Sequence, residues 1–341
     1  MRQRLPLRTI PEGQAEGNLR LSLGDRVSIH KVEPPTCPAC AEGLLADDLT
    51  TDRLHIIRCP ACHHRIGIHE DPASSADYHE QYHVPYHNAG DFLQALRATR
   101  HRQAEAILSR IRAYAPDATR VLDFGCGRGW FLESALRTGF QVAGADTSRV
   151  AIQLLAGAGI PYVLIPPNGK LPVKSLPFLP HVVTLLDVIE HFPANEVSSF
   201  LAELVSMLRR ELQLLVIKVP VSGGAFYRTA VTLARIGITG PLEQLYQVGT
   251  EPPHLSYFSS RSACATVTRS GLQLVGVLAD RDFEPDLLPA RAHAFSRLPR
   301  VLSIATGYAA AGGVGVLGLE DSKVLFAKPS PVSGRAGAFA N

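Results

Sequence analysis

The sequence predicts an α/β chain whose main sheet is largely parallel and is preceded by a small cysteine-rich module. From Arg120 onward, apolar runs of strand length alternate with helical patterns. Such alternation implies right-handed crossovers and a sheet covered on both faces. Three glycines at alternate positions separate the first of these strands from the helix that follows it. Two Cys-x-x-Cys pairs stand before this region and account for the separate module.

The order of the elements follows from the positions of the apolar runs. A first helix is expected in the second half of 78–114, because apolar residues recur there at near-helical spacing before Pro116. Strands are expected at 120–124, 141–145, 161–165, 182–187, 213–219, 272–278 and 322–327. Helices are expected at 129–138, 148–157, 195–210 and from Ser259 or Ser260 to Arg269, with an inserted helical segment at 225–250.

These patterns divide the chain into parts. We expect a poorly structured leader at 1–33, the cysteine module at 34–70, a helical connector at 71–116, the main domain at 117–328 and a flexible tail at 329–341. Within the main domain, 225–255 reads as an insert that is interpreted as a lid.

Composition and charge narrow the class of protein. The chain has 341 residues, of which 46% are hydrophobic and 19% charged, and this is typical of a globular protein with a sizeable core. The net charge of +3 gives no general argument for nucleic acid binding. The N-terminus lacks a long apolar run, so we expect a cytoplasmic protein. Residues 301–319 carry no charge, but they are rich in Gly and Ala, which favours a buried helix over a membrane span.

The cysteine module has the spacing of a metal site. Cys37, Cys40, Cys59 and Cys62 form a C-x2-C-x18-C-x2-C array, in which each pair offers two thiolates to one tetrahedral ion. The array predicts a structural zinc ion. Disulfides are the alternative, and a cytoplasmic chain disfavours them. His63 and His64 follow the second pair and are not expected to bind the metal, because four thiolates complete the set.

The glycine-rich turn predicts a nucleotide-type ligand with a positive charge. Val121 to Gly129 reads Val-Leu-Asp-Phe-Gly-Cys-Gly-Arg-Gly, and glycines here let the backbone approach a ligand closely. Asp123 would repel a pyrophosphate but attract an ammonium or sulfonium group. The second strand ends at Asp146, 21 positions after Gly125, which is close to the spacing of an acid that holds ribose hydroxyls.

This turn resembles motif I of class I S-adenosylmethionine (SAM)-dependent methyltransferases, and Val182 to Phe192 resembles their fourth strand and the turn after it. The resemblance implies a Rossmann-like, seven-stranded sheet whose last strand is antiparallel, and SAM as cofactor. It implies that Asp123 and the three glycines hold the methionine part and that Asp146 holds the ribose. The full set of expected cofactor-binding residues is Asp123, Gly125, Cys126, Gly127, Gly129, Asp146, Thr147 and Asp187. The acid that many relatives carry after strand three is missing from Ile165–Gly169, which leaves the adenine contact open.

The acceptor side is predicted from histidines and a tyrosine. His191 lies where the fourth strand opens into the site and could act as a base or orient the acceptor, or be a structural histidine. His254 and Tyr257 lie in a segment that resembles one found after strand five in zinc-ribbon-bearing methyltransferases of small molecules. Tyr78 to His87 forms an aromatic and imidazole cluster that either closes over the acceptor or begins a surface helix.

Three functions remain open from sequence alone. The first is methyl transfer to a small molecule, either sugar-linked or a secondary metabolite. The second is methylation of an RNA base, with the ribbon gripping RNA and with phosphate contacts from Arg97, Arg100, Arg102, Arg110 and Arg112; these arginines equally fit a solvated helix face. The third is a non-catalytic SAM-binding subunit. The sequence does not predict the acceptor or the oligomeric state.

Overall fold

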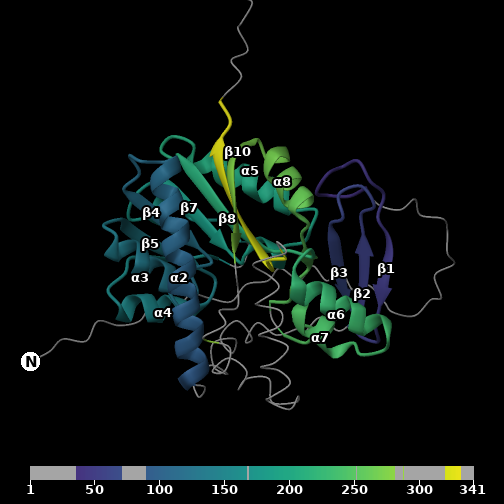
Figure 1. The fold of residues 1–341 in the computed structure, drawn as a ribbon. Coiled ribbons are helices and arrows are strands. Elements are labelled where there is room, and N and C mark those ends of the chain that lie inside the picture. The colour runs from purple at the N-terminus through teal and green to yellow at the C-terminus, as the bar shows by residue number, and fades with distance from the viewer. Residues whose placement is uncertain are drawn as a thin grey trace, which may run out of the picture. The chain divides into compact units, whose positions relative to one another are not determined.

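The computed structural model describes residues 36–70, 90–166, 169–250, 252–280, 287 and 319–331. Figure 1 shows these parts as a large sheet with helices and a smaller sheet beside two short helices. The leader, the Tyr78–His87 cluster, residues 301–318 and nearly all of the C-terminal tail lie outside the described residues. Among the residues that are described, no helix is both long and apolar enough to cross a membrane.

The large sheet has seven strands in the order β10-β11-β8-β7-β4-β5-β6. The strands are β4 (Arg120–Phe124), β5 (Gln141–Asp146), β6 (Tyr162–Leu164), β7 (Val182–Leu186), β8 (Leu214–Pro220), β10 (Leu272–Asp280) and β11 (Ser322–Pro329). All pairs are parallel except those of β11, which runs antiparallel to both β8 and β10. The predicted strands, their parallel pairing and the antiparallel last strand are therefore confirmed.

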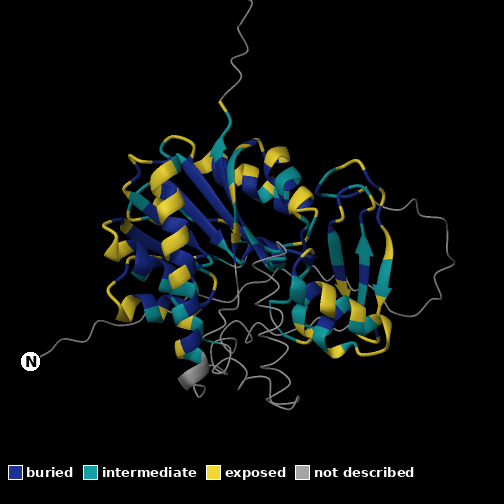
Figure 2. Cartoon of the chain, viewed as in Figure 1, coloured by how far each residue is buried: buried dark blue, intermediate teal, exposed yellow. Residues whose placement is uncertain are grey.

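Helices cover both faces of this sheet. One face packs against α2 (Gly90–Tyr114), α3 (Trp130–Arg137) and α4 (Arg149–Gly157), and the other packs against α5 (Val197–Leu208) and α8 (Ser260–Arg269). Alternate strand residues serve the two faces: Leu122 joins one hydrophobic cluster and Val121 joins the other. Figure 2 shows the consequence, with buried central strands and exposed outer helix faces. Two single-turn 3-10 helices, η1 (Val173–Ser175) and η2 (Ile189–His191), complete this part.

The small sheet has four antiparallel strands in the order β1-β2-β3-β9. These are β1 (Ala46–Thr50), β2 (Leu54–Arg58), β3 (Arg65–His69) and β9 (Ser256–Tyr257). Helices α6 (Ala225–Arg235) and α7 (Gly240–Leu245) pack against this sheet through a shared cluster that includes Leu54, Tyr227 and Tyr246. The expected helices within 225–250 are thus present, and their buried residues pack against the small sheet.

Candidate functional site

A pocket of about 700 Å³ opens at the carboxyl ends of the parallel strands. It lies where β4 pairs with β5 on one side and with β7 on the other, which is the switch point at which α/β sheets bind ligands. Its lining includes the glycine turn, the ends of β5 and β7, the η2 segment, one side of α2 and the Pro252-Pro253 pair. From the 225–255 segment, Pro252 and Pro253 line the pocket and no residue of α6 or α7 does, so the lid interpretation stays a prediction.

The glycine turn adopts backbone conformations that side chains disfavour. Gly125, Gly127 and Gly129 have φ angles of +75°, +50° and +75°. A Cβ on Gly125 would lie 2.5 Å from Val188, whereas a Cβ on Gly127 would meet nothing within 4 Å. Gly127 therefore faces open space in the pocket lining, and its lack of a side chain leaves room for a ligand to approach the backbone.

Asp146 organises this turn from the end of β5. Its Oδ2 accepts a hydrogen bond of 2.8 Å from Gly127 N, and its Oδ1 accepts one of 2.8 Å from Ser148 N at the start of α4. Thr147 lies between these anchors and also lines the pocket. The predicted spacing of turn and acid thus brings Asp146 into direct contact with the glycine loop.

Asp123 lies at the base of the pocket and is almost completely buried. The Thr184 hydroxyl donates a 2.6 Å hydrogen bond to its Oδ1. Burial raises the pKa of this carboxyl to about 7, an effect that nearby Asp146 increases and the Thr184 bond opposes. Near neutral pH the group can therefore change charge when a cation enters the pocket.

Cys126 is a buried residue of the same turn. Its sulfur packs close to Gly144 on β5, where an added Cβ would lie only 2.8 Å from it. Burial raises the pKa of this thiol well above its ordinary value, with the Asp146 carboxylate adding to the effect. The thiol therefore stays protonated, and its position fits a small filler rather than a nucleophile.

Asp187 connects the pocket to a charged chain. Its Oδ2 lies 2.8 Å from Arg100 Nη1 on α2 and 3.1 Å from Lys218 Nζ on β8, and Lys218 Nζ lies 3.3 Å from Asp280 Oδ2 on β10. Asp187 itself has a φ angle of +59°. Arg100 and Lys218 both line the pocket and were missed as site residues. A lysine within the apolar run of β8 was the signal that could have identified one of them.

His191 and His254 lie against each other beside the pocket, with ring centroids 4.8 Å apart in an edge-on arrangement. His191 Nδ1 donates a 2.8 Å hydrogen bond to the Pro253 carbonyl, which leaves Nε2 with the lone pair. The fully buried Glu190 belongs to the same group, because its carboxylate and the two imidazoles place one ligand-type atom each within 4.8 Å of one another. His191 lines the pocket directly.

Tyr257 is placed differently from the two histidines. It is buried among Tyr227 and Tyr246, with ring centroids 4.6 and 4.9 Å away, and its hydroxyl donates a 3.0 Å hydrogen bond to the Leu245 carbonyl. It is absent from the pocket lining. Its contacts are those of a packing residue between β9 and the α6–α7 pair, so the structure offers no geometric support for Tyr257 as an acceptor residue.

The four cysteines of the first module form a compact sulfur group. Cys37 Sγ lies 3.6 Å from Cys62 Sγ, and Cys40 Sγ lies 3.7 Å from Cys59 Sγ. These separations are too long for disulfides, and they match the edge of about 3.8 Å expected for a tetrahedron with zinc–sulfur bonds of about 2.3 Å. All four ligand atoms lie within 4.8 Å of one another, and neither His63 nor His64 belongs to the group.

The two cysteine knuckles share one backbone design. A residue with positive φ directly follows the second cysteine of each pair: Ala41 at +59° and His63 at +60°. In the second knuckle, Cys62 N lies 3.4 Å from Cys59 Sγ. Such turns direct both sulfurs of a pair to one side, so the residues present fit a metal ion held by four thiolates.

One segment ties this module to the histidine group. Residues Ser256 and Tyr257 pair with β3, Leu255 N donates to the Glu190 carbonyl at 2.8 Å, and the Ser259 hydroxyl donates to the Cys62 carbonyl. Ser259 also forms the capping box of α8. The short stretch from His254 to Ser259 therefore connects the second knuckle, the histidine pair and the main domain.

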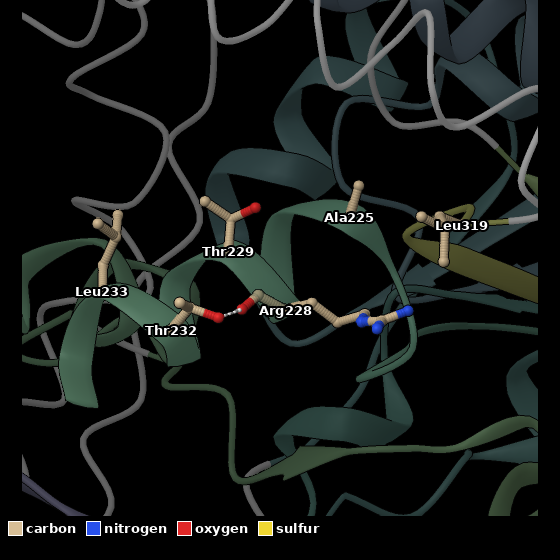
Figure 3. Close-up of a pocket in the computed structure, with 6 residues that line it drawn as sticks. All are labelled: Ala225, Arg228, Thr229, Thr232, Leu233 and Leu319. Carbon is tan, nitrogen blue, oxygen red and sulfur yellow. Dashed lines mark hydrogen bonds between the residues drawn. The ribbon is translucent and has the colours of Figure 1, made fainter. Parts of the chain in front are cut away.

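A second hollow, of about 350 Å³, lies along α6 and is shown in Figure 3. Ala225, Arg228, Thr229, Thr232 and Leu233 line it together with Leu319, and the Thr232 hydroxyl donates to the Arg228 carbonyl at 2.8 Å. Its described lining residues include neither a carboxylate nor an imidazole, and none of them lines the larger pocket.

The arginines of α2 bond largely within the protein. Arg97 Nη2 lies 2.7 Å from Glu133 Oε2, Arg100 pairs with Asp187, and the Arg112 guanidinium lies 3.8 Å from the centre of the Phe140 ring. Three of the five arginines considered for phosphate contacts are thus held by the main domain itself, which weakens the case for RNA on this helix.

Comparison with known families gives a match over residues 96–277 to the family described as a methyltransferase domain. This segment covers more than half of the chain, from α2 to β10, and contains the glycine turn, Asp146, Asp187 and both histidines. No curated protein sequence matches the chain.

Solved structures with a similar fold are distant in sequence. A SAM-dependent methyltransferase from Archaeoglobus fulgidus is 20% identical over 66% of this chain and 94% of that chain, with a TM-score of 0.40. A cyclopropane synthase from Mycobacterium tuberculosis is 14% identical over 76% and 100%, with a TM-score of 0.48. A 1,6-didemethyltoxoflavin-N1-methyltransferase from Burkholderia thailandensis, solved with 1,6-didemethyltoxoflavin and S-adenosylhomocysteine bound, is 15% identical over 84% and 99%, with a TM-score of 0.40.

Proposed function

Because this chain belongs to the methyltransferase-domain family, we propose that it transfers the methyl group of SAM to a small-molecule acceptor bound in the pocket at the ends of β4, β5 and β7. The observation that carries the proposal is the contact between the glycine turn and Asp146. It joins a close-approach backbone to an acid with two accepting oxygens at the switch point of the sheet.

The residues present fit SAM part by part. Gly127 leaves open space beside the backbone for the methionine portion, and Asp123 supplies a carboxyl that gains charge when a cation lies near it. Asp146 and Thr147 are assigned to the ribose. Ile165 and Gly169 line the side of the pocket on which the adenine would lie, where an apolar surface and backbone groups take the place of the missing acid. A pocket of about 700 Å³ is within the range for ligands of this size.

The chain's own residues would act in transfer chiefly by positioning. SAM supplies an electrophilic methyl on sulfur; in the displacement the carbon–sulfur bond breaks as the bond to the acceptor forms. Such a step is faster when the two reactants are held in line. A pocket that excludes water strengthens the electrostatic interactions that hold them there. We assign His191 and His254 to the acceptor side, because His191 lines the pocket at the η2 turn. Arg100 closes the pocket from α2 through its bond to Asp187.

We also propose that Cys37, Cys40, Cys59 and Cys62 hold a structural zinc ion. When bound, the ion replaces a core that this small module does not have on its own. The sulfur separations and the paired positive-φ turns support a closed set of four thiolates, which leaves no coordination position for a substrate.

The test begins with calorimetry of purified, zinc-loaded protein against SAM and S-adenosylhomocysteine. We expect binding of both, and at least about tenfold weaker binding in Asp146→Ala, because a carboxylate that accepts two hydrogen bonds is lost. Lys170→Ala, which removes an exposed side chain that is not part of the pocket lining, is the control. If neither SAM nor S-adenosylhomocysteine gave any heat of binding, the proposal of SAM binding would be refuted.

The acceptor class is tested separately with tritiated SAM. Label transferred to a small-molecule extract supports the proposal, whereas label in total RNA with none in the extract would support the RNA alternative. SAM binding without transfer to either pool would support a non-catalytic subunit.

A further inference from the structure

The Glu190, His191 and His254 group is the part of the site that neither the four cysteines nor the SAM-binding residues use. We propose that these three side chains bind a divalent transition-metal cation at the wall of the pocket, in a site distinct from the cysteine module. One carboxylate and two imidazoles form a donor set that suits ions such as Zn²⁺, Fe²⁺ or Co²⁺.

The geometry of the three ligands supports this assignment. Each offers one ligand atom, and all these atoms lie within 4.8 Å of one another. Around a tetrahedral ion with bonds of about 2.1 Å, ligand atoms stand about 3.4 Å apart, so side-chain movements of about an ångström would close the set. Glu190 and His191 are neighbours in η2, and His254 reaches them from the segment that follows α7.

The surrounding hydrogen bonds orient the imidazoles as metal ligands require. Histidines that bind metals usually donate their second ring nitrogen to a carbonyl or carboxylate. His191 Nδ1 does so to the Pro253 carbonyl, which directs the Nε2 lone pair elsewhere. His254 Nε2 lies 3.0 Å from the Gln247 side-chain amide. Rotation of that amide lets Gln247 Oε1, which has no hydrogen-bond partner, accept the Nε2 proton and leaves Nδ1 of His254 as the ligand atom.

Burial adds a second reason. The Glu190 residue is 0% exposed, and a buried carboxylate needs compensation by a cation or by hydrogen bonds. A divalent ion bound between the three side chains would be such a cation. The exposed pair of His55 and Asp47, with His55 Nε2 2.9 Å from Asp47 Oδ1, shows the contrast of a histidine–carboxylate contact on the surface.

Three protein ligands leave at least one coordination position for another group. His191 and Pro253 both line the pocket, so that position is next to the space assigned to the acceptor. This extension depends on the proposed function: the class of acceptor that the site favours is one with a hydroxyl or carboxylate oxygen, since oxygen completes the coordination of such ions.

The experiment uses full-length protein whose cysteine site has been filled with zinc. Cobalt(II) alone is then titrated in, and binding is followed by its visible absorption and by equilibrium dialysis with metal analysis. We expect one further equivalent of Co²⁺ with nitrogen and oxygen ligands. In His254→Ala and Glu190→Gln, the Co²⁺ affinity should fall at least about tenfold, as loss of a ligand demands. His55→Ala should bind like the wild type.

The outcomes separate this proposal from the one on SAM. SAM binding is also measured by calorimetry, without cobalt, for the wild type and every variant. If the wild type binds SAM but takes up no further cobalt, the metal site is refuted and the SAM proposal is not. Cobalt binding that is unchanged in both His254→Ala and Glu190→Gln would also refute it, and would indicate a Glu–His hydrogen-bonded pair instead. If Glu190→Gln does not fold, judged by thermal unfolding, His191→Ala takes its place because that side chain is only partly buried.

Discussion

Gly127 combines a φ angle of +50° with open space where a Cβ would stand, so it is the position at which a single side chain changes the pocket most directly. Asp123, two residues before the first glycine, contributes charge rather than shape, because burial has brought its pKa to about 7. Gly127 affects the space available to the ligand, which is measured as SAM affinity. Asp123 affects charge, which is measured as the pH dependence of stability.

Gly127→Ala should weaken SAM binding at least about tenfold, because the added methyl enters the open space through which the ligand approaches the backbone. Calorimetry with SAM measures this. Gly139→Ala is the matched control, since Gly139 has a φ angle of +86°, no atom near an added Cβ and no place in the pocket lining. Equal loss of SAM affinity in both variants would contradict the assignment of Gly127.

Asp123 should make the stability of the ligand-free protein fall as the pH rises from about 4 to about 7. Its pKa rises from 3.8 to about 7 on folding, so in this range the folded state keeps a proton that the unfolded chain has released. The contribution is complete below the unfolded pKa and is lost as the pH passes the folded one. Thermal unfolding of the wild type and of Asp123→Asn isolates it as a difference.

In that experiment the Asn variant should gain melting temperature relative to the wild type as the pH rises from 5 toward 8. Asp117→Asn, which changes an exposed carboxylate just before β4, should leave the difference flat. A wild-type minus Asp123→Asn difference that does not vary with pH would show that Asp123 titrates normally.

At the scale of elements, the stretch from His254 to Ser259 joins three parts of the molecule. It adds β9 to the small sheet, it bonds to the second cysteine knuckle through Ser259, and it carries His254 to the pocket wall. The cysteine module thereby helps to position a residue on the acceptor side, although no described residue of that module lines the pocket.

Cys59→Ser should therefore reduce methyl transfer more than SAM binding. If the four cysteines hold zinc as proposed, loss of one thiolate should release the ion and loosen the knuckles, whose buried cluster consists of the cysteines with Ala39 and Leu45. We expect SAM affinity to stay within about threefold of wild type, because the module is separate from the pocket lining. Metal analysis, calorimetry and turnover measure the three effects, and Cys264→Ser on α8 is the control. Full turnover in zinc-free Cys59→Ser would contradict this coupling.

Across the whole molecule, a chain of alternating charges links elements that lie far apart in the sequence. Arg100 on α2, Asp187 after β7, Lys218 on β8 and Asp280 on β10 follow one another at 2.8, 3.1 and 3.3 Å. Lys218 is 1% exposed, so its charge depends on both neighbouring carboxylates. Removal of Lys218 takes a cation away from the buried Asp280 carboxylate, whereas Asp187 keeps its contact with Arg100.

Lys218→Met should lower the free energy of unfolding by about 3 kcal/mol, since it leaves the Asp187 and Asp280 carboxylates without their shared cation. Denaturant unfolding measures this, and the double variant with Asp280→Asn should recover part of the loss. Lys170→Met removes a cation from an exposed pair with Glu203 and should cost less than about 1 kcal/mol. If Lys218→Met and Lys170→Met lowered the free energy of unfolding by similar amounts, burial would not strengthen the ion pairs of Lys218.

The sequence alone determined those features that depend on residues close together in the chain. The glycine turn, the cysteine pairs and the strand-to-helix alternation depend on local backbone conformation and periodicity, and the structure has the predicted seven strands in place. Only the tertiary structure decided that Arg100 contacts Asp187, that His254 lies against His191 and that Tyr257 is buried among other tyrosines. Those contacts join residues on different elements, and their distances depend on crossovers and strand register that no local pattern records.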